Sequence, residues 1–143
     1  MKTVSIKTTE ADRKWWVVDL EGQTLGRAAA RIAAIIRGKH KATFTPNTDT
    51  GDFVVVVNVE KVQFTGKKLD QKEYQDYSHY AGGQKITSAK EMLARKPEEI
   101  IRRAVKRMMP RGPLGYKQLA KLKLYAGNQH PHQAQQPQEL KLK

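Results

Sequence analysis

The predicted fold follows from Phe53-Val54-Val55-Val56-Val57, a run of five apolar residues directly after the turn residues Thr50-Gly51-Asp52. A strand with one solvated face would alternate polar and apolar side chains, whereas this run shows no alternation. Its β-branched valines favour the pleated backbone of a strand, and its length is usual for a strand but short for a helix. The run therefore predicts the central strand of a mostly parallel sheet that is covered on both faces.

A strand and then a helix precede this run. The apolar residues of Trp15–Leu20 predict a strand that ends at the turn residues Glu21 and Gly22. From residue 25 to residue 36, apolar side chains recur at the spacing of one buried helical stripe, with Thr24 placed to cap its start and Gly38 to end it. A strand, a helix and a second strand in this order predict a right-handed βαβ unit.

The segments on either side of the central strand carry weaker patterns. Gly38–Asn47 combines positive charge, hydroxyls and one aromatic ring, which suits phosphate and sugar contacts or an ordinary solvated loop. Val62–Thr65 predicts a short strand. The tyrosines of Glu73–Tyr80 could form one face of a helical turn, pack across strands, or offer their rings to nucleic-acid bases. These alternatives stay open at the level of sequence.

The last third of the chain has the most regular helical patterns. Ser88 with Glu91 three residues later is a capping-box pattern, and the helix that it begins should end before Pro97. Pro97 suits the first position of a second helix, and residues 116–120 predict a short third one. Leu122–Ala126 alternates and predicts a final strand. In the second helix we expect a buried stripe of Ile100, Ile101, Ala104, Val105 and Met108, and a basic side of Arg102, Arg103, Lys106 and Arg107.

These patterns predict a single α/β domain. It should have three layers, with a small, mostly parallel sheet of about four strands covered by helices, and with basic loops. We place an N-terminal arm at residues 1–14, the α/β domain at 15–127 and an extended C-terminal tail at 128–143. The tail is rich in Gln and Pro, and we expect it to be extended or disordered unless a partner orders it.

Charge is the strongest compositional signal. The 143 residues include 27 Lys and Arg against 14 Asp and Glu, a net charge of +13 that implies a polyanionic partner. No apolar run approaches the roughly 20 residues of a membrane-spanning helix, and the N-terminus lacks the apolar core of a signal peptide. The absence of cysteine excludes disulfides, thiolate metal sites and cysteine catalysis. We therefore expect a cytoplasmic protein that binds no membrane.

No motif predicts an active site, a metal or a cofactor. Gly22 and Gly26 lie between a strand and a helix but lack the residues of a phosphate-binding loop, so we interpret Gly26 as allowing close helix packing. The two histidines of His130–His132 lack further metal ligands nearby. Asp49 and Asp52 are interpreted as turn residues, and no serine or threonine has a base at a recognisable spacing. We expect a protein that is not an enzyme.

Several runs of the chain follow one family pattern, in order and without large gaps. The runs are Asp19–Ala29, Gly38–Lys41 with Phe44–Asn47, Gly66–Lys72, Val105–Tyr116 and Leu122–Gly127 followed by His130–His132. Together they closely resemble the bacterial large-subunit ribosomal protein thirteen family. Three places depart from that pattern: Arg107 stands where glycine is expected, Tyr116 where arginine is expected, and Tyr80-Ala81 where the family has a Gly-Tyr-Pro type of loop.

The resemblance implies a non-catalytic constituent of the large ribosomal subunit. Such a protein would have a three-layer α/β domain, bind large-subunit ribosomal RNA, act early in subunit assembly and contact neighbouring ribosomal proteins. We expect it to be monomeric outside the ribosome and to need no cofactor or metal. The residues expected to contact RNA are Arg27, Arg31, Arg37, Lys39, His40, Lys41, Lys67, Lys68, His79, Gly82, Gly83, Lys85, Arg102, Arg103, Lys106, Arg107, Arg111, Gly112, Gly115 and Lys117.

Two other classes of function can be separated from this one by experiment. An RNA-acting enzyme would show turnover that substitution of Asp49, Asp52 or His79 abolishes. A DNA architectural protein would lose its bound RNA to duplex DNA at equal affinity.

Overall fold

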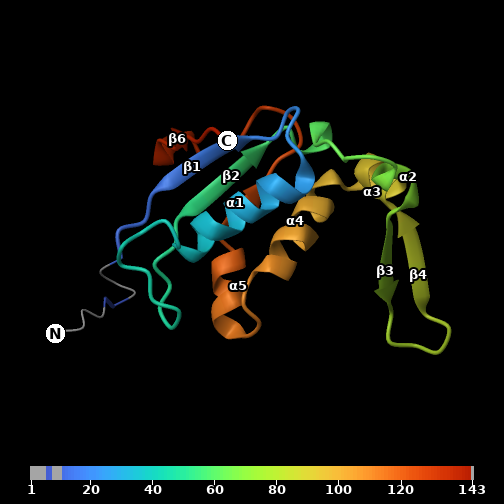
Figure 1. Ribbon diagram of the computed structural model, residues 1–143, viewed down its shortest axis with the longest axis horizontal. Coiled ribbons are helices and arrows are strands. Elements are labelled where there is room, and N and C mark those ends of the chain that lie inside the picture. Colours follow the sequence, from blue (N-terminus) through green and yellow to red (C-terminus); the bar gives the residue numbers. More distant parts are fainter. Residues whose placement is uncertain (1–5, 8–10, 143) are drawn as a thin grey trace.

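The computed structural model describes residues 6, 7 and 11–142, which form an α/β fold around a four-stranded parallel sheet (Figure 1). The strands are β1 (Trp15–Asp19), β2 (Phe53–Val57), β5 (Leu122–Leu124) and β6 (Gln138–Glu139), in the order β5-β2-β1-β6. β2 lies inside the sheet and pairs in parallel with both β1 and β5. The predicted central position of the Phe53–Val57 run is thereby confirmed.

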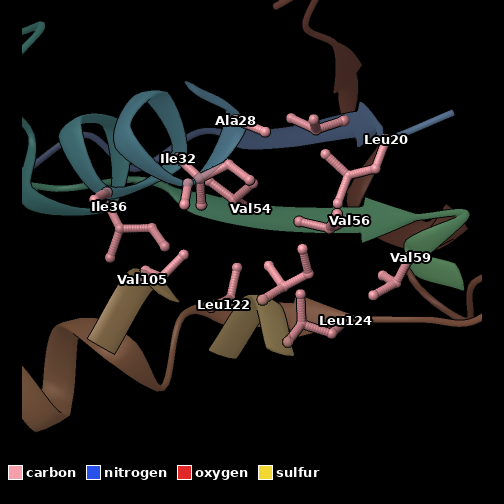
Figure 2. Close-up of a cluster of buried hydrophobic side chains, with 14 of the residues drawn as sticks. Leu20, Ala28, Ile32, Ile36, Val54, Val56, Val59, Val105, Leu122 and Leu124 are labelled. Atoms are coloured by element: carbon pink, nitrogen blue, oxygen red, sulfur yellow. The ribbon is translucent and has the colours of Figure 1, made fainter. Parts of the chain in front are cut away.

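One face of the sheet is covered by helices. These are α1 (Leu25–Arg37), α4 (Pro97–Met108) and α5 (Pro113–Leu119), which lie below the sheet in Figure 1. Figure 2 shows the core between these layers, where side chains from alternate strand positions meet the helices. Each such side chain stabilises the fold by roughly 1.5–3 kcal/mol when fully buried. The core includes Val18, Val54, Val56, Leu122 and Leu124 from the sheet and Ile32, Ile36, Ile101 and Val105 from the helices.

The opposite face of the sheet is covered by the C-terminal segment. Trp15 of β1 and Phe53 of β2 stack with their ring centroids 4.4 Å apart, and the His132 ring lies 5.1 Å from Trp15. The Tyr125 hydroxyl and His132 Nε2 form a 2.8 Å hydrogen bond that holds this segment in place. Val55, which shares this face, is completely buried. The segment, with the short 3-10 helix η2 (Gln133–Gln135), makes the third layer.

The C-terminal tail, which we expected to be extended or disordered unless a partner ordered it, includes an extended strand that the protein itself orders against the sheet. β6 adds to the free edge of β1, where Trp16 aligns with Gln138, and the Leu140 amide donates to the Val17 carbonyl at 2.8 Å. Leu140 and Leu142 pack against the core. Pairing satisfies backbone groups on an otherwise open sheet edge, which composition alone does not reveal.

Helix α1 begins and ends where the sequence predicts. Thr24 is its N-cap in an extended conformation, although its side chain makes no capping hydrogen bond. Gly38 ends it with a left-handed φ of 83°, and a Cβ there would lie 2.7 Å from the Thr50 hydroxyl oxygen. Gly26, by contrast, is exposed and a Cβ on it would meet nothing within 4 Å. The interpretation that Gly26 allows close helix packing is therefore wrong.

A β-hairpin projects from the body of the molecule at the end away from the loop that follows α1 (Figure 1). It consists of β3 (Glu73–Tyr77) and β4 (Gln84–Ser88), paired antiparallel between α2 (Lys68–Gln71) and α3 (Ala89–Arg95). The tyrosine-rich segment is thus a strand and not a helical turn. Ser88 caps α3 as predicted, because its Oγ accepts the Glu91 amide at 3.2 Å.

Two local predictions differ from the structure. The predicted strand at Val62–Thr65 is only an isolated bridge between Thr24 and Gln63, because the 3-10 helix η1 (Val59–Lys61) turns the chain away from the sheet. Met108 is 42% exposed, although we expected it in the buried stripe of α4. The helix ends there and the chain turns into an extended conformation, which points Met109 inward instead.

Candidate nucleic-acid interface

His40 and Lys41, two predicted RNA contacts, are both bound to a buried carboxylate. The Asp52 side chain is completely buried and lies 2.5 Å from Lys41 Nζ and 2.9 Å from His40 Nε2. Trp16 Nε1 donates to it at 2.9 Å and the Lys14 amide at 3.1 Å. The carboxylate therefore ties the loop after α1 to the starts of β1 and β2. An RNA contact of His40 or Lys41 stays a prediction.

The electrostatics of Asp52 follow from this coordination. Burial by itself would raise the pKa of Asp52. Hydrogen bonds from Lys41, Trp16 and the Lys14 amide outweigh burial, so that the pKa lies below the ordinary value of 3.8. The carboxylate therefore stays charged at neutral pH and neutralises Lys41.

A second buried pair lies beside the first. Lys121 is only 4% exposed, and its Nζ donates to Asp49 Oδ1 at 2.5 Å. Burial lowers the pKa of Lys121, and the contact with Asp49 only partly offsets this effect. Arg13 approaches the same carboxylate at 3.9 Å. Asp49 and Asp52, interpreted from the sequence as turn residues, therefore also hold the fold together. Asp49 pairs with the distant, buried Lys121, and Asp52 joins Lys41 to the start of β1.

Three of the predicted cations of α1 and of the segment after it are exposed to solvent. Arg27, Arg31 and Lys39 are exposed, and they form no ion pair with a carboxylate in the described part of the chain. Arg37 is half-buried, with its guanidinium 5.9 Å from the centroid of the Phe44 ring. This side of α1 can receive phosphates without first breaking an internal contact.

The cations of α4 divide into paired and unpaired ones. Arg103 donates to Asp76 Oδ2 of β3 at 2.8 Å and to Glu99 Oε1 at 3.1 Å, and the Asp76 contact raises the pKa of the guanidinium further. Arg102 lies 3.9 Å from Glu99. Arg107 has no carboxylate within ion-pair distance among residues 6–7 and 11–142. The helix is therefore less free to bind anions than its sequence suggests.

The turn between α4 and α5 is held from inside the protein. Gly115 is buried, and a Cβ on it would lie 1.9 Å from the Pro110 carbonyl oxygen. Gly112 has a φ of 111° and open space around it. Exposed cations surround this turn, with Arg111 and Lys117 at its sides and Lys106 Nζ 5.8 Å from the centroid of the Tyr116 ring. Gly112 can be approached by a ligand, whereas Gly115 already contacts the chain itself.

The tip of the hairpin presents rings to solvent. Tyr77 is 56% and Tyr80 78% exposed, and the His79 ring packs edge-on against Tyr77 at 5.5 Å. Gly82 has a left-handed φ of 68°, and a Cβ on Gly83 would lie 2.1 Å from the Ser78 hydroxyl oxygen. Exposed rings of this kind suit stacking on unpaired bases.

The predicted site residues do not converge on one spot. The hairpin with His79, Gly82, Gly83 and Lys85 lies at one end of the long axis, and the loop with Lys39, His40 and Lys41 at the other (Figure 1). Lys68 is the first residue of α2 and Lys67 directly precedes it. Both are exposed and lie near the base of the hairpin. An interface of this kind is an elongated cationic surface, which suits a large polyanion better than a small ligand.

Sequence reasoning missed one group of side chains that the fold assembles. A pocket of about 310 Å³ brings Gly26 of α1 together with Phe64, Lys68, Tyr74 and Arg107. Tyr74 is 6% exposed, and burial raises the pKa of its hydroxyl although Arg103 and Arg107 oppose that effect. The contributing segments lie far apart in the sequence, so no local pattern could have found the pocket.

The parallel sheet, the helical layer and the unpaired surface cations define a basic α/β protein suited to a polyanionic partner. None of the helices in the described residues is both long and apolar enough to cross a membrane. A sequence model of the ribosomal protein L13 family matches residues 13–131. The chain therefore belongs to the ribosomal protein L13 family, whose members are structural components of the ribosome and not enzymes.

Proteins similar in sequence match this chain over nearly its whole length. A protein of Aquifex aeolicus called large ribosomal subunit protein uL13 is 58% identical over 143 residues, which is 100% of this chain and 99% of the relative. Proteins with the same name from Psychrobacter arcticus and Dictyoglomus thermophilum are each 56% identical, over 140 and 142 residues. They cover 98% and 99% of this chain, and 99% and 100% of the respective relatives. The resemblance recognised in the sequence is thereby confirmed, and the chain is a structural constituent of the large ribosomal subunit.

Proposed function

We propose that this protein binds large-subunit ribosomal RNA and supports an early stage of subunit assembly. The observation that carries the proposal is the set of exposed cations on α1, α2, α4 and α5, and in the segments next to these helices, that have no carboxylate partner in the described chain. In a protein with a net charge of +13, such cations repel each other until a polyanion binds. They are Arg27, Arg31, Lys39, Lys67, Lys68, Lys106, Arg107, Arg111 and Lys117.

Neutralisation of phosphates is the main source of affinity in this proposal. The cations position the protein on the RNA backbone, and the exposed rings at the hairpin tip read unpaired bases. Neighbouring ribosomal proteins are the second kind of partner, and outside the ribosome the protein is a monomer. Its location is then the ribosome.

Gradient sedimentation of a cell lysate, with and without ribonuclease, tests the proposal. We expect the protein to migrate with the large subunit at moderate salt and to leave that fraction after ribonuclease treatment. Precursor particles of the large subunit should already contain it if it acts early in assembly. Migration as a free small protein beside intact ribosomes would contradict the proposal, and equal competition by duplex DNA would point to a DNA-binding protein instead.

A further inference from the structure

The pocket between α1, α2 and α4 combines a cationic side with an apolar wall. It lies where β1 and β2 end, which is the side of a parallel α/β sheet where ligands bind. Its volume of about 310 Å³ is at the lower end of the range for ligand pockets and suits one small ligand.

The cations of this pocket differ in how free they are. Arg103 is neutralised by Asp76 and Glu99. Lys68, Lys72 and Arg107 have no ion pair within residues 6–7 and 11–142, so their charge is available to a ligand. Lys68 Nζ donates only to the neutral Thr65 hydroxyl, at 3.4 Å. Three ammonium and guanidinium groups without a carboxylate partner at one pocket favour a ligand with a multiply charged anionic group, of which phosphate is the best match.

The remaining walls favour a flat, partly apolar group beside that anion. Phe64 is half-buried at the pocket, and Met108 is 42% exposed because the helix ends there. The Tyr74 ring lies with Lys72 Nζ 5.4 Å and the Arg103 guanidinium 5.7 Å from its centroid. Gly26 contributes no side chain, and a Cβ on it would meet only open space, so the ligand can reach the backbone of α1.

We propose that this pocket binds one unstacked nucleotide of single-stranded RNA. Lys68, Lys72 and Arg107 hold its phosphate, and Phe64 and Met108 pack against its base and sugar. The inference rests on the proposed RNA-binding function and adds a defined site to it. A single base taken out of the stack and packed on side chains is a usual way to recognise RNA, because a folded helix hides its base edges.

The experiment titrates the full chain with the four nucleoside 5′-monophosphates and with inorganic phosphate. The readout is the NMR signal of the Met108 methyl group in protein labelled with 13C at the methionine methyls, assigned with a Met108→Leu variant. We expect saturable shifts of this signal with at least one nucleotide, at an affinity at least tenfold above that of inorganic phosphate. Arg107→Ala should weaken the nucleotide about tenfold, because one charged hydrogen bond is lost.

A charge placed in the pocket gives a sharper test with a matched control. Gly26→Glu fits the first turn of α1, where a carboxylate is favourable to the helix, so the variant should fold. Its carboxylate would bind the free cations and repel phosphate, and nucleotide shifts at Met108 should be lost. Ala134→Glu makes the same charge change at an exposed position of η2, in the layer on the opposite face of the sheet, and should keep these shifts.

The outcomes separate this inference from the function on which it rests. If no nucleotide shifts the Met108 methyl signal while the protein still binds large-subunit ribosomal RNA, the inference of a nucleotide site is wrong and the proposed RNA-binding function is unaffected. If inorganic phosphate shifted the Met108 signal at the same affinity as the nucleotides, the pocket would bind anions in general and the inference of a nucleotide site would be wrong. If the unmodified protein did not bind large-subunit ribosomal RNA, the proposed function itself would be wrong.

Discussion

At the scale of single residues, buried charged side chains connect separate segments of this protein. Asp52 accepts hydrogen bonds from two segments on opposite sides of α1 in the sequence. Removing one member of a buried ion pair is costly because the other stays charged without a partner. Asp52 therefore links loop conformation to stability.

Asp52→Asn should lower the free energy of unfolding by about 2 kcal/mol, somewhat less than for a fully buried pair because Lys41 keeps some contact with solvent. Urea unfolding followed by circular dichroism measures the change. Asp70→Asn removes an exposed carboxylate that has no ion pair among the described residues, and should change the free energy by less than about 0.5 kcal/mol. Equal stability of both variants would contradict the role given to Asp52.

The same carboxylate predicts a dependence of stability on pH. Because the pKa of Asp52 is lower in the folded protein than its ordinary 3.8, its contribution is fully present above that value. The contribution is lost as the pH falls through the lowered pKa of the folded state. Urea unfolding between pH 6 and pH 3 should therefore show a smaller loss of stability in Asp52→Asn than in the unmodified protein. Parallel curves would remove Asp52 from the acid response.

Two glycines give opposite expectations for the same substitution. Gly115→Ala should lower the free energy of unfolding by about 2 kcal/mol or more, because the new Cβ would lie against the Pro110 carbonyl oxygen. Gly26→Ala should leave it unchanged or raise it by up to about 1 kcal/mol, because the space is open and alanine favours the helix. Thermal unfolding of the two variants side by side measures this difference. If Gly26→Ala lowered the free energy of unfolding, Gly26 would be needed for close helix packing after all.

At the scale of elements, the orientation of the β3–β4 hairpin depends on few contacts. It projects from the body, and its outer half exposes Tyr77, Tyr80 and Ile86 (Figure 1). Arg103 connects its base to α4 through Asp76 and Glu99. An element with so few buried contacts has low local stability.

Arg103→Met should loosen the hairpin without unfolding the protein. We expect faster amide hydrogen exchange within residues 73–88, with a change in global stability below about 1 kcal/mol because the pairs are partly exposed. Arg102→Met is the control, since its contact with Glu99 lies within α4. Unchanged exchange in the first variant would show that packing of Tyr74 alone orients the hairpin.

At the scale of the whole molecule, the elongated distribution of free cations predicts a steep dependence of RNA binding on salt. Each phosphate contact contributes a slope of roughly −0.7 to −0.9 in a plot of log affinity against log salt. Replacing Arg111 and Lys117 by Ala should flatten the slope by about 1.4 to 1.8, if both contact phosphates. Filter binding of large-subunit ribosomal RNA at several salt concentrations gives the slope.

A charge-matched control separates contact from net charge. Lys61 and Arg95 are paired with Glu21 and Glu91, so replacing both by Ala should change the slope little. If this control flattened the slope as much as the Arg111 and Lys117 variant, then net charge and not local contact would govern binding.

Much of the fold could be predicted because its signals are local. The strand Phe53–Val57, the limits of α1 and the cap of α3 at Ser88 depend on side chains within one or two turns of each other. Most of the candidate interface residues were also visible as basic side chains. Which of them are free was not visible, because Lys41 and Arg103 find their carboxylates only in the folded chain.

The sequence by itself determined the parallel α/β class, the central strand, the amphipathic helices, the cationic character and the family. The family depends on motifs that follow one another along the chain, and the other features depend on composition or on spacing along a single element. Only the tertiary structure decided the β6 pairing, the Asp52 and Asp49 charge pairs, the projection of the hairpin and the pocket beside Gly26. These features join residues far apart in the chain, and the interactions exist only once the sheet and helices have brought those residues together.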